Sequence, residues 1–506
     1  MKEKLLLILL NIVFSAYSQN AALDPTFGNA GISVHPHPHT AEIRCFAFDP
    51  NGNIISTGYA LQGATISKTR LVLTKTDKNG ILDTSFGTNG KVTTVIGNSE
   101  YVIAIAIQPD GKIIVAGQVN LPGGINSGFV CRYNNDGSLD TSFATNGIYI
   151  SPVTSEFSSL MLLSNGSIIL GGNTYINNDY LAIIAKLNSN GTEDINFGTN
   201  GVLSLTSTNF KFIMQEAILL NNGSIFCLGY EYSDTVNHSK SAYCKIDTQG
   251  NFDTTFGTNG KVVIDLFNYN PISNLIEYLH TARELTNGQI IIAGSEQNQF
   301  MAKVNTDGTL DTTFGNNGIA SQFVSMRHKS MVVQSDGKII IGSGTGLAIG
   351  ARAYRITRFD NNGNLDTTFN NGKGMVDINA SAGDDWVNHI KLQANDTLII
   401  GGFSTLNSVA SFTLARVLLD TPLSIEEPLE QFIKVYPNPF NDRLFVEDFE
   451  GIIKNIKIFD NTGRIIKTVS NSNNVKEIYT DFSSGIYNIT LETKDGRIIS
   501  KKMIKK

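Results

Sequence analysis

Leu310-Asp-Thr-Thr-Phe-Gly-Asn-Asn-Gly318 is the clearest copy of a phrase that occurs seven times in this 506-residue chain. Its phenylalanine recurs about every 57 residues, and a fixed period of that size is typical of arrays whose units bury their cores against one another. The phenylalanines are Phe27, Phe86, Phe143, Phe197, Phe256, Phe314 and Phe369. The repeat therefore predicts a chain built from similar supersecondary units.

A second recurring phrase consists of an apolar run, a tight turn and another apolar run. One copy joins Ile105–Gln108 to Ile113–Gly117 through Pro109-Asp-Gly-Lys112. Short β-branched runs around Asp-Gly or Asn-Gly predict a β-hairpin. Other copies lie at Asp49–Gly58, Leu163–Gly172, Leu220–Gly229, Leu285–Gly294, Gln334–Gly342 and Gln393–Gly402.

Two further strands complete each period. One ends in a basic residue before an Asx-rich turn, as in Phe129-Val-Cys-Arg132 followed by Tyr133-Asn-Asn-Asp-Gly137. The other follows the Phe-Gly phrase, as at Lys91–Val95. No apolar rhythm of 3.6 residues indicates a long helix between Gly28 and Asp420. Four antiparallel strands per unit of about 57 residues predict an all-β chain of β-propeller blades.

The ends of the repeat region complement each other. The region opens with Leu23-Asp-Pro-Thr-Phe27, which has no preceding strand of its own, and it closes at Leu414–Leu419 without that phrase. A ring formed this way leaves only short sheet edges, whereas an open stack needs two caps. We therefore predict a closed seven-bladed β-propeller over residues 19–420.

A charge pattern sets the expected register. A basic residue stands eight positions before an aspartate in six units. These pairs are Lys75/Asp83, Arg132/Asp140, Lys186/Asp194, Lys245/Asp253, Lys303/Asp311 and Arg358/Asp366. Arg416 lacks such an aspartate downstream, and Asp24 lacks a basic residue upstream. We expect each pair to lie across its turn, and Arg416 to meet Asp24 where the ring closes.

The two ends of the chain differ from the repeats. Residues 1–18 have the charged start, short apolar core and small-residue cleavage site of a secretory signal, with cleavage between Ser18 and Gln19. Residues 421–433 form an acidic linker that contains proline. A small β domain is expected over residues 434–506, with strands near Arg443–Val446, Ile456–Phe459, Ile465–Val469 and Ile486–Glu492.

Motifs in both regions resemble known families. Val435-Tyr436-Pro437-Asn438-Pro439-Phe440, Ser484-Gly485-Ile486-Tyr487 and the basic tail Lys501–Lys506 resemble the C-terminal sorting domain of the type IX secretion system of Bacteroidetes. That resemblance implies an immunoglobulin-like β-sandwich and export through the type IX machinery. The Leu-Asp-x-Thr-Phe-Gly and Asp-Gly-Lys-Ile phrases resemble the delta-60 repeat family, which implies a fold and no assigned chemistry.

Composition excludes several functional classes. The net charge is −6, which argues against nucleic-acid binding because phosphates require a basic surface. No segment after the signal is long and apolar enough to predict a membrane span. The four cysteines form no disulfide scaffold; Cys131 and Cys244 occupy small core positions, and Cys227 with Cys244 are candidates for one cross-strand disulfide.

Two motifs suggest metal sites and also have simpler explanations. His35-Pro-His-Pro-His39 offers three imidazoles, but alternating proline favours an extended chain that separates them, so a surface loop is expected. Asx-rich turns such as Asn134–Asp140 and Asn305–Asp311 have a calcium-like spacing. Asx and Gly are also what tight turns require, so no metal or cofactor is predicted.

Positions at which the units differ are the candidate ligand site. Aligned on the hairpin turn, one position of the first strand holds Arg44, Ile103, Ser158, Gln215, His280, Lys329 and Asn388, and a second, two residues earlier, includes Tyr101 and Trp386. If this strand lines a central channel, the varied ring would bind a ligand. The alternative is drift on a solvated face. The predicted ligand-binding residues are Arg44, Tyr101, Gln215, His280, Lys329, Trp386 and Asn388.

Catalysis has little support in the sequence. Asp384 and Asp385 lie near Trp386 and His389, but no nucleophile motif accompanies them in a strand-turn-helix context. We therefore predict a secreted or cell-surface, noncatalytic binding or scaffold propeller with an unknown extracellular ligand. The alternatives are a secreted enzyme that uses the blade-specific residues and a structural or adhesive surface module.

Overall fold

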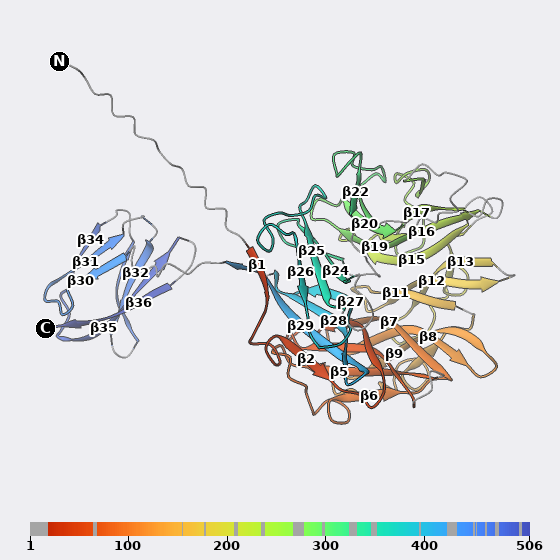
Figure 1. Ribbon diagram of the computed structural model, residues 1–506, viewed down its shortest axis with the longest axis horizontal. Helices are drawn as coiled ribbons and strands as arrows, with labels where there is room; N and C mark the ends of the chain where they lie inside the picture. The colour runs from red at the N-terminus through yellow and green to blue at the C-terminus, as the bar shows by residue number, and fades with distance from the viewer. Residues whose placement is uncertain are drawn as a thin grey trace, which may run out of the picture. The chain divides into compact units, whose positions relative to one another are not determined.

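The computed structural model describes residues 19–506 except 64–67, 154, 177–178, 207–210, 234–237, 267–277, 296–298, 323–330, 346–351, 394–395, 423–432, 449–450, 452, 461–462, 471–474 and 495–497. The chain divides into two compact units, of which the first ends at Thr421 and the second begins at Pro422. Both units are built from β-strands, and the described residues contain no α-helix (Figure 1). The signal segment before Gln19 and most of the linker lie outside the described residues.

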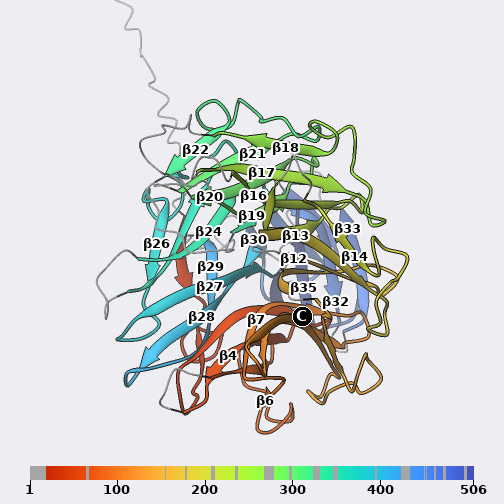
Figure 2. The same ribbon diagram turned by 90° about the vertical axis from the view of Figure 1, so that its right-hand side faces the viewer.

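The first unit consists of repeated antiparallel sheets with their strands in chain order. Its described strands form six four-stranded sheets and one five-stranded sheet. In Figure 2 the sheets follow one another around a common centre, from red and orange below through yellow and green to blue. This all-β arrangement of repeated four-stranded sheets is consistent with a propeller.

Each sheet contains the four strands that the repeat predicts. The first strands are β3 (Ala41–Phe48), β7 (Ser99–Ile107), β11 (Ser155–Leu162), β15 (Phe212–Leu219), β19 (Tyr278–Glu284), β23 (Met331–Val333) and β27 (Asp385–Leu392). The second strands are β4 (Ile54–Leu61), β8 (Ile113–Leu121), β12 (Ile168–Ile176), β16 (Ile225–Ser233), β20 (Ile290–Ser295), β24 (Ile339–Gly344) and β28 (Leu398–Leu406).

The two outer strands of each sheet complete the pattern. The third strands are β5 (Thr69–Thr76), β9 (Ile125–Tyr133), β13 (Asp179–Leu187), β17 (His238–Ile246), β21 (Gln299–Val304), β25 (Tyr354–Phe359) and β29 (Val409–Pro422). The fourth strands are β6 (Lys91–Thr94), β10 (Ile148–Ile150), β14 (Val202–Ser204), β18 (Lys261–Ile264), β22 (Ile319–Gln322), β26 (Met375–Ile378) and β2 (Ile32–His35).

Neighbouring sheets bury one apolar cluster between them. Residues at the start of the second strands are buried on both faces, as Ile113, Ile114 and Val115 of β8 show with no exposed surface. A strand covered on both faces reads as a continuous apolar run, which explains the β-branched stretches of the hairpin phrase. One cluster joins Phe27, Phe46 of β3, Ile399 of β28 and Leu414 of β29, so the last sheet packs against the first.

The start of the chain completes the last sheet. β2 pairs with β29, with Ile32 opposite Ala415 and His35 opposite Phe412. β1 (Gln19–Leu23) also pairs with β29, so the red and blue ends of the first unit lie side by side in Figure 1. Arg416 Nε donates to Asp24 Oδ2 at 2.8 Å. The predicted meeting of Arg416 with Asp24 is confirmed.

The other predicted ion pairs are also present. The nitrogen–oxygen distances are 3.8 Å for Lys75–Asp83, 2.7 Å for Arg132–Asp140, 3.1 Å for Lys186–Asp194, 3.0 Å for Lys245–Asp253, 3.3 Å for Lys303–Asp311 and 2.8 Å for Arg358–Asp366. In most units the same cation also lies over the phenylalanine of the repeat phrase, as Arg132 lies 4.6 Å from the Phe143 ring centre. These contacts fix the register of the third strand against the turn that follows it.

The repeat phrase also attaches each sheet to the next. The backbone nitrogen of Gly28 donates to Asn79 O at 2.7 Å, and that of Gly87 donates to Asp136 O at 2.8 Å. The Phe27 ring fills the space in front of Gly80, whose added Cβ would lie 2.8 Å from the ring. The Asx-rich turn therefore needs glycine at this point because a neighbouring aromatic ring occupies the place of a side chain.

The second unit contains two sheets. The strands β30 (Ile433–Tyr436), β31 (Arg443–Asp448) and β34 (Val475–Tyr479) form one, and β33 (Ile465–Ser470), β32 (Ile453–Phe459), β35 (Gly485–Thr493) and β36 (Ile498–Lys505) form the other. Leu444, Ile456 and Ile489 belong to their shared buried core. β30 and β34 were not predicted, because their short sequences alternate weakly.

Candidate functional site

The first strands of the sheets surround one shared cavity of about 750 Å³. Residues of β3, β7, β11, β15, β19, β23 and β27 all line it, so every sheet of the first unit contributes. Ligand sites typically measure about 300–1,000 Å³ and are mostly apolar with a few placed polar groups. This cavity has a volume in that range and a wall of mixed apolar and polar residues, and it is therefore the candidate functional site.

The variable position of the first strand is a β-bulge. The pairing of first and second strands skips Arg44, Ile103, Ser158, Gln215, His280 and Asn388. A bulge residue has no partner in the strand ladder, so its side chain is free to differ between units. The bulge also explains the repeated glycine on the second strand: a Cβ on Gly117 would lie 2.1 Å from Tyr101 O.

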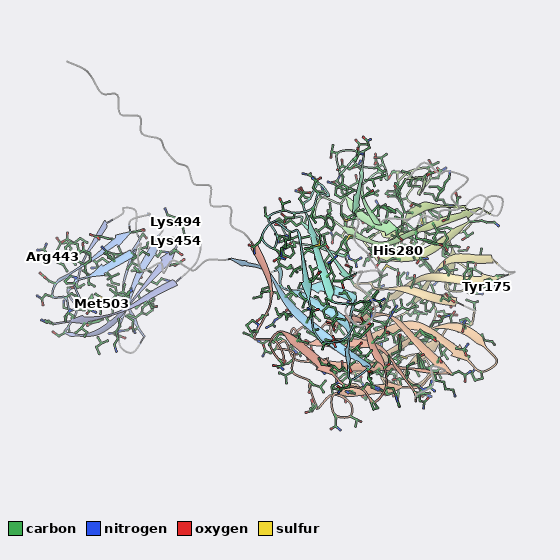
Figure 3. The ribbon with its side chains drawn as sticks, viewed as in Figure 1. Tyr175, His280, Arg443, Lys454, Lys494 and Met503 are labelled. Atoms are coloured by element: carbon green, nitrogen blue, oxygen red, sulfur yellow. The ribbon has the colours of Figure 1, made fainter. Side chains whose placement is uncertain are left out.

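The structure distributes the residues of this variable position over two environments. Arg44 and Asn388 line the cavity, and Asn388 Nδ2 donates to Ile43 O of the adjacent sheet at 2.8 Å. Gln215 and His280 are not among its lining residues. His280 Nε2 lies 2.8 Å from Ser295 Oγ, and Figure 3 shows it toward the middle of the first unit, with Tyr175 at the outer edge. Lys329 lies outside the described residues.

Tyr101 and Trp386 lie between sheets and do not line the cavity. The Tyr101 ring centre is 6.2 Å from that of Tyr59 in the preceding sheet. Trp386 packs beside Gly344 of β24, and the Arg352 guanidinium lies 5.3 Å from its ring centre. Both side chains point to the neighbouring second strand, because residues two positions before the bulge face the preceding sheet.

The side chains of residues directly after the bulge accept hydrogen bonds from backbone N–H groups of an adjacent sheet. Ala217 N donates to Ser159 Oγ at 2.8 Å, and Ala282 N donates to Glu216 Oε2 at 2.9 Å. Phe46 N donates to His389 Nδ1 at 3.4 Å across the closing interface. Buried backbone donors require partners, so these side chains have a structural task in the wall.

The cavity also contains charged residues that the sequence reasoning missed. Arg283 Nη1 lies 3.3 Å from Glu216 Oε2, and Glu284 Oε2 accepts a hydrogen bond of 2.6 Å from Asn221 N. Lys391 lines the same cavity. Burial within the wall and the charge of Arg283 lower the pKa of Lys391. The sequence does contain a signal for two of them. When the repeat units are aligned with one another, Arg283 and Lys391 occupy a position that is apolar in the other units.

The two motifs with metal-like spacing have structural roles here. The surface loop predicted for His35 to His39 is wrong for His35, which ends β2, is 4% exposed and lies 3.1 Å from Ser33 Oγ through Nε2. The turn oxygens hold their own backbone, as when Asp307 Oδ1 accepts from Thr309 N at 2.9 Å. The described residues contain no group of three metal-ligating side chains.

The cysteines are buried as free thiols. Cys227 and Cys244 are directly opposite each other on β16 and β17, as the sequence predicted for neighbouring strands. The candidate disulfide between them is not formed in this structure. Burial raises the pKa of the Cys131 thiol to about 12, as expected for a small core residue. Cys45 lines the cavity.

The sorting motif has a local structural explanation. Asn438 Nδ2 donates to Lys502 O at 3.1 Å and its Oδ1 accepts from Ile504 N at 2.9 Å, which attaches the motif to β36. Tyr487 is buried against Phe482, with ring centres 4.5 Å apart. Tyr436 Oη donates to Glu447 Oε1 at 2.6 Å. Pro437 and Pro439 flank Asn438, and Gly485 opens β35.

Comparison with protein families agrees with both units. Residues 108–143, 163–197, 285–314 and 334–369 match the family described as "Domain of unknown function (DUF5122) beta-propeller". Residues 434–506 match the secretion system C-terminal sorting domain. The chain carries DUF5122 beta-propeller repeats of the delta-60 type and a type IX sorting domain. The sorting domain indicates export, followed by attachment to the cell surface or secretion.

Solved structures with similar arrangements are distant in sequence. A protein of unknown function from Bacteroides caccae is 10% identical, with a TM-score of 0.35, over 63% of this chain and 93% of that chain. Drosophila Semaphorin 2a is 9% identical, with a TM-score of 0.32, over 91% and 96%. Pyrococcus horikoshii acylaminoacyl peptidase is 10% identical, with a TM-score of 0.38, over 80% and 57%.

No curated protein sequence matches this chain. Among its described residues, no helix has the length and apolar character needed to cross a membrane.

Proposed function

We propose that this protein is an exported, noncatalytic propeller that binds an extracellular ligand in its central cavity. The observation that carries the proposal is the cavity itself, which all the first strands share and whose wall includes the variable bulge residues Arg44, Ile103, Ser158 and Asn388. The scaffold of a repeat protein requires similar residues in every unit, whereas a binding surface requires residues that differ between units. Repeated backbone with varied side chains at one cavity is therefore the arrangement expected of a binding module.

The finer architecture belongs to the same proposal. We infer a closed ring of seven blades, with β2 and Asp24 completing the last one, and an immunoglobulin-like sandwich in the second unit. The buried cluster that joins Phe27 and Ile399 supports closure. The two sheets around Leu444 and Ile489 support the sandwich. An experimental structure with an unclosed spiral would contradict the ring.

The contacts in the wall favour binding over catalysis. Glu216 and His389 would be the acid–base candidates of the cavity, and each accepts a hydrogen bond from the backbone of the next sheet. Glu216 also pairs with Arg283. A general acid or base must exchange its proton with a substrate, and these groups already hold the wall together.

A cavity-filling variant tests the proposal. Ile103 is a bulge residue of the wall, so Ile103→Trp fills the cavity without changing a residue that is paired in the strand ladder. Ile81→Trp is the matched control, because the Ile81 side chain is 58% exposed. A library of extracellular metabolites and glycans is screened by thermal shift. A ligand at about 100 times its Kd adds roughly 2.7 kcal/mol of stability.

The expected ligand stabilises the wild type and Ile81→Trp and leaves Ile103→Trp unchanged. A ligand that stabilises Ile103→Trp as strongly as the wild type binds elsewhere and overturns the cavity as the site. Conversion of the bound compound by the wild-type protein overturns the noncatalytic assignment.

A further inference from the structure

One position in the cavity wall departs from the repeat in only two sheets. This position lies five residues before the glycine of the hairpin turn, whose place Asp396 takes in the last unit. In five units the position is apolar: Ala47, Ala106, Met161, Ile218 and Val332. β19 has Arg283 there and β27 has Lys391, and both side chains line the cavity. The two cations lie on the first strands of two sheets that are separated by a single sheet. They give this part of the wall a local positive character.

The two cations differ in how their charges are balanced. Arg283 pairs with Glu216 at 3.3 Å and its Nη1 also donates to Thr281 Oγ1 at 3.1 Å. Within the described part of the chain, no carboxylate lies within ion-pair distance of Lys391. Its Nζ lies 6.0 Å from the ring centre of Phe48. Lys391 is therefore a cation of the cavity wall to which the described residues supply no carboxylate counter-charge.

A counter-charge from outside the chain would balance Lys391. The side chain is exposed to the solvent of the cavity, and the surrounding wall and then the like charge of Arg283 lower its pKa, against a smaller opposing contribution from Cys45. Charges taken from bulk water are stable when they are paired. An anionic group bound at Lys391 supplies that pairing.

Part of the wall is apolar. Ile105, Leu160, Met161, Ile218 and Ile390 line the same cavity as Lys391. A small, fully hydrated anion leaves these surfaces without a contact, whereas an apolar body removes them from water at about 25 cal/mol per Å². The site thus combines Lys391, for which the described residues supply no carboxylate partner, with an apolar part of the cavity wall.

We propose that the cavity binds an amphiphilic organic anion, with its anionic head at Lys391 and its apolar body against the Ile105, Leu160 and Met161 side of the wall. This inference rests on the proposed binding function and names the chemical class of its ligand. A free organic acid and an acid released from a lipid share this chemistry.

Two fluorescent probes with the same aromatic body separate the charge from the apolar contribution. 8-Anilinonaphthalene-1-sulfonate is an amphiphilic anion, and N-phenyl-1-naphthylamine lacks the sulfonate. Their binding to the chain from Gln19 to Lys506 is measured for the wild type, Lys391→Met, Lys391→Arg and the surface control Lys68→Met. Methionine is tolerated at this repeat position, because Met161 occupies it in β11.

We expect Lys391→Met to weaken binding of the sulfonate probe roughly tenfold, the loss of one charge-assisted contact, and to leave the neutral probe unchanged. Lys391→Arg and Lys68→Met should retain the wild-type affinity for both probes. Octanoate should displace the sulfonate probe at concentrations at which inorganic phosphate does not. A sulfonate affinity unchanged in Lys391→Met, or equal displacement by phosphate and octanoate, overturns the inference.

The Ile103→Trp variant distinguishes this failure from that of the proposed function. If Ile103→Trp abolishes binding of both probes while Lys391→Met affects neither, the cavity remains the site and the anionic class is wrong. If both probes bind Ile103→Trp as well as the wild type, they do not occupy the cavity, and the proposed function fails together with the inference.

Discussion

The outer turns and the inner strands of the first unit differ in what is repeated from sheet to sheet. At the outer turns the side chains themselves repeat, as in the pairs Arg132–Asp140 and Arg358–Asp366 with their phenylalanines. On the inner strands the backbone bulge repeats while its side chain changes from Arg44 to Ile103 to Asn388. Repeated side chains at the turns therefore hold this fold together, while a fixed backbone surrounds a variable cavity.

The glycine opposite the bulge gives the strongest test of the repeated backbone. A Cβ on Gly117 would lie 2.1 Å from Tyr101 O, so Gly117→Ala must separate β7 from β8 or remove the bulge. We expect a loss of about 4 kcal/mol in the free energy of unfolding, in the range of severe core substitutions. Urea unfolding measures it.

Gly124→Ala in the next turn of the same sheet is the control. Gly124 has a φ of 80° and nothing within 4 Å of an added Cβ, so only backbone strain opposes alanine there. A loss of about 1 kcal/mol is expected for it. Equal losses for the two variants would show that the bulge does not require its glycine.

The success of the sequence reasoning follows the same division. The ion pairs could be predicted because each consists of two residue types at a fixed spacing, and spacing is visible in sequence. The bulge could not, because glycine on the second strand marks a turn as readily as a close backbone approach. Arg44 lines the cavity in the structure, whereas Tyr101, which precedes the bulge of its strand by two residues, faces a neighbouring sheet.

The repeated ion pairs differ in burial, which gives a second test. Arg358 and Asp366 are 0% and 5% exposed and lie 2.8 Å apart, whereas Lys75 and Asp83 are 10% and 31% exposed and 3.8 Å apart. In Asp366→Asn, a neutral amide replaces the carboxylate that faces the buried Arg358 guanidinium. We expect it to cost about 3 kcal/mol, and Asp83→Asn less than about 1 kcal/mol.

Urea unfolding of both variants checks this order. Asn at either position keeps the size of the side chain and can still accept from the following hydroxyl, Thr368 or Ser85. The difference between the variants therefore reports the charge. Equal effects would mean that the pairs set register alone and that burial does not decide their contribution.

The strand β2 carries a pH dependence in the mildly acidic range. His35 is buried at the end of β2, near Lys91, whose Nζ donates to Pro36 O. Desolvation, and then the charge of Lys91, lower the pKa of His35 from 6.5 to about 4. Between these values the unfolded chain binds a proton that the folded chain does not, so stability falls as the pH falls through this window.

The smallest expected effect is therefore a loss of about 2 kcal/mol between pH 8 and pH 5 that depends on His35. His35→Gln removes the titrating group, so its stability should change less over this range than that of the wild type, whereas His39→Gln should follow the wild type. Urea unfolding at both pH values measures the difference. Because β2 is the strand that joins the two ends of the first unit, acid should release this strand before the fourth strands of the other sheets, and hydrogen exchange at Ile32–His35 should rise first. Parallel pH profiles for the wild type and His35→Gln would show that the closing strand is no more sensitive to acid than the rest.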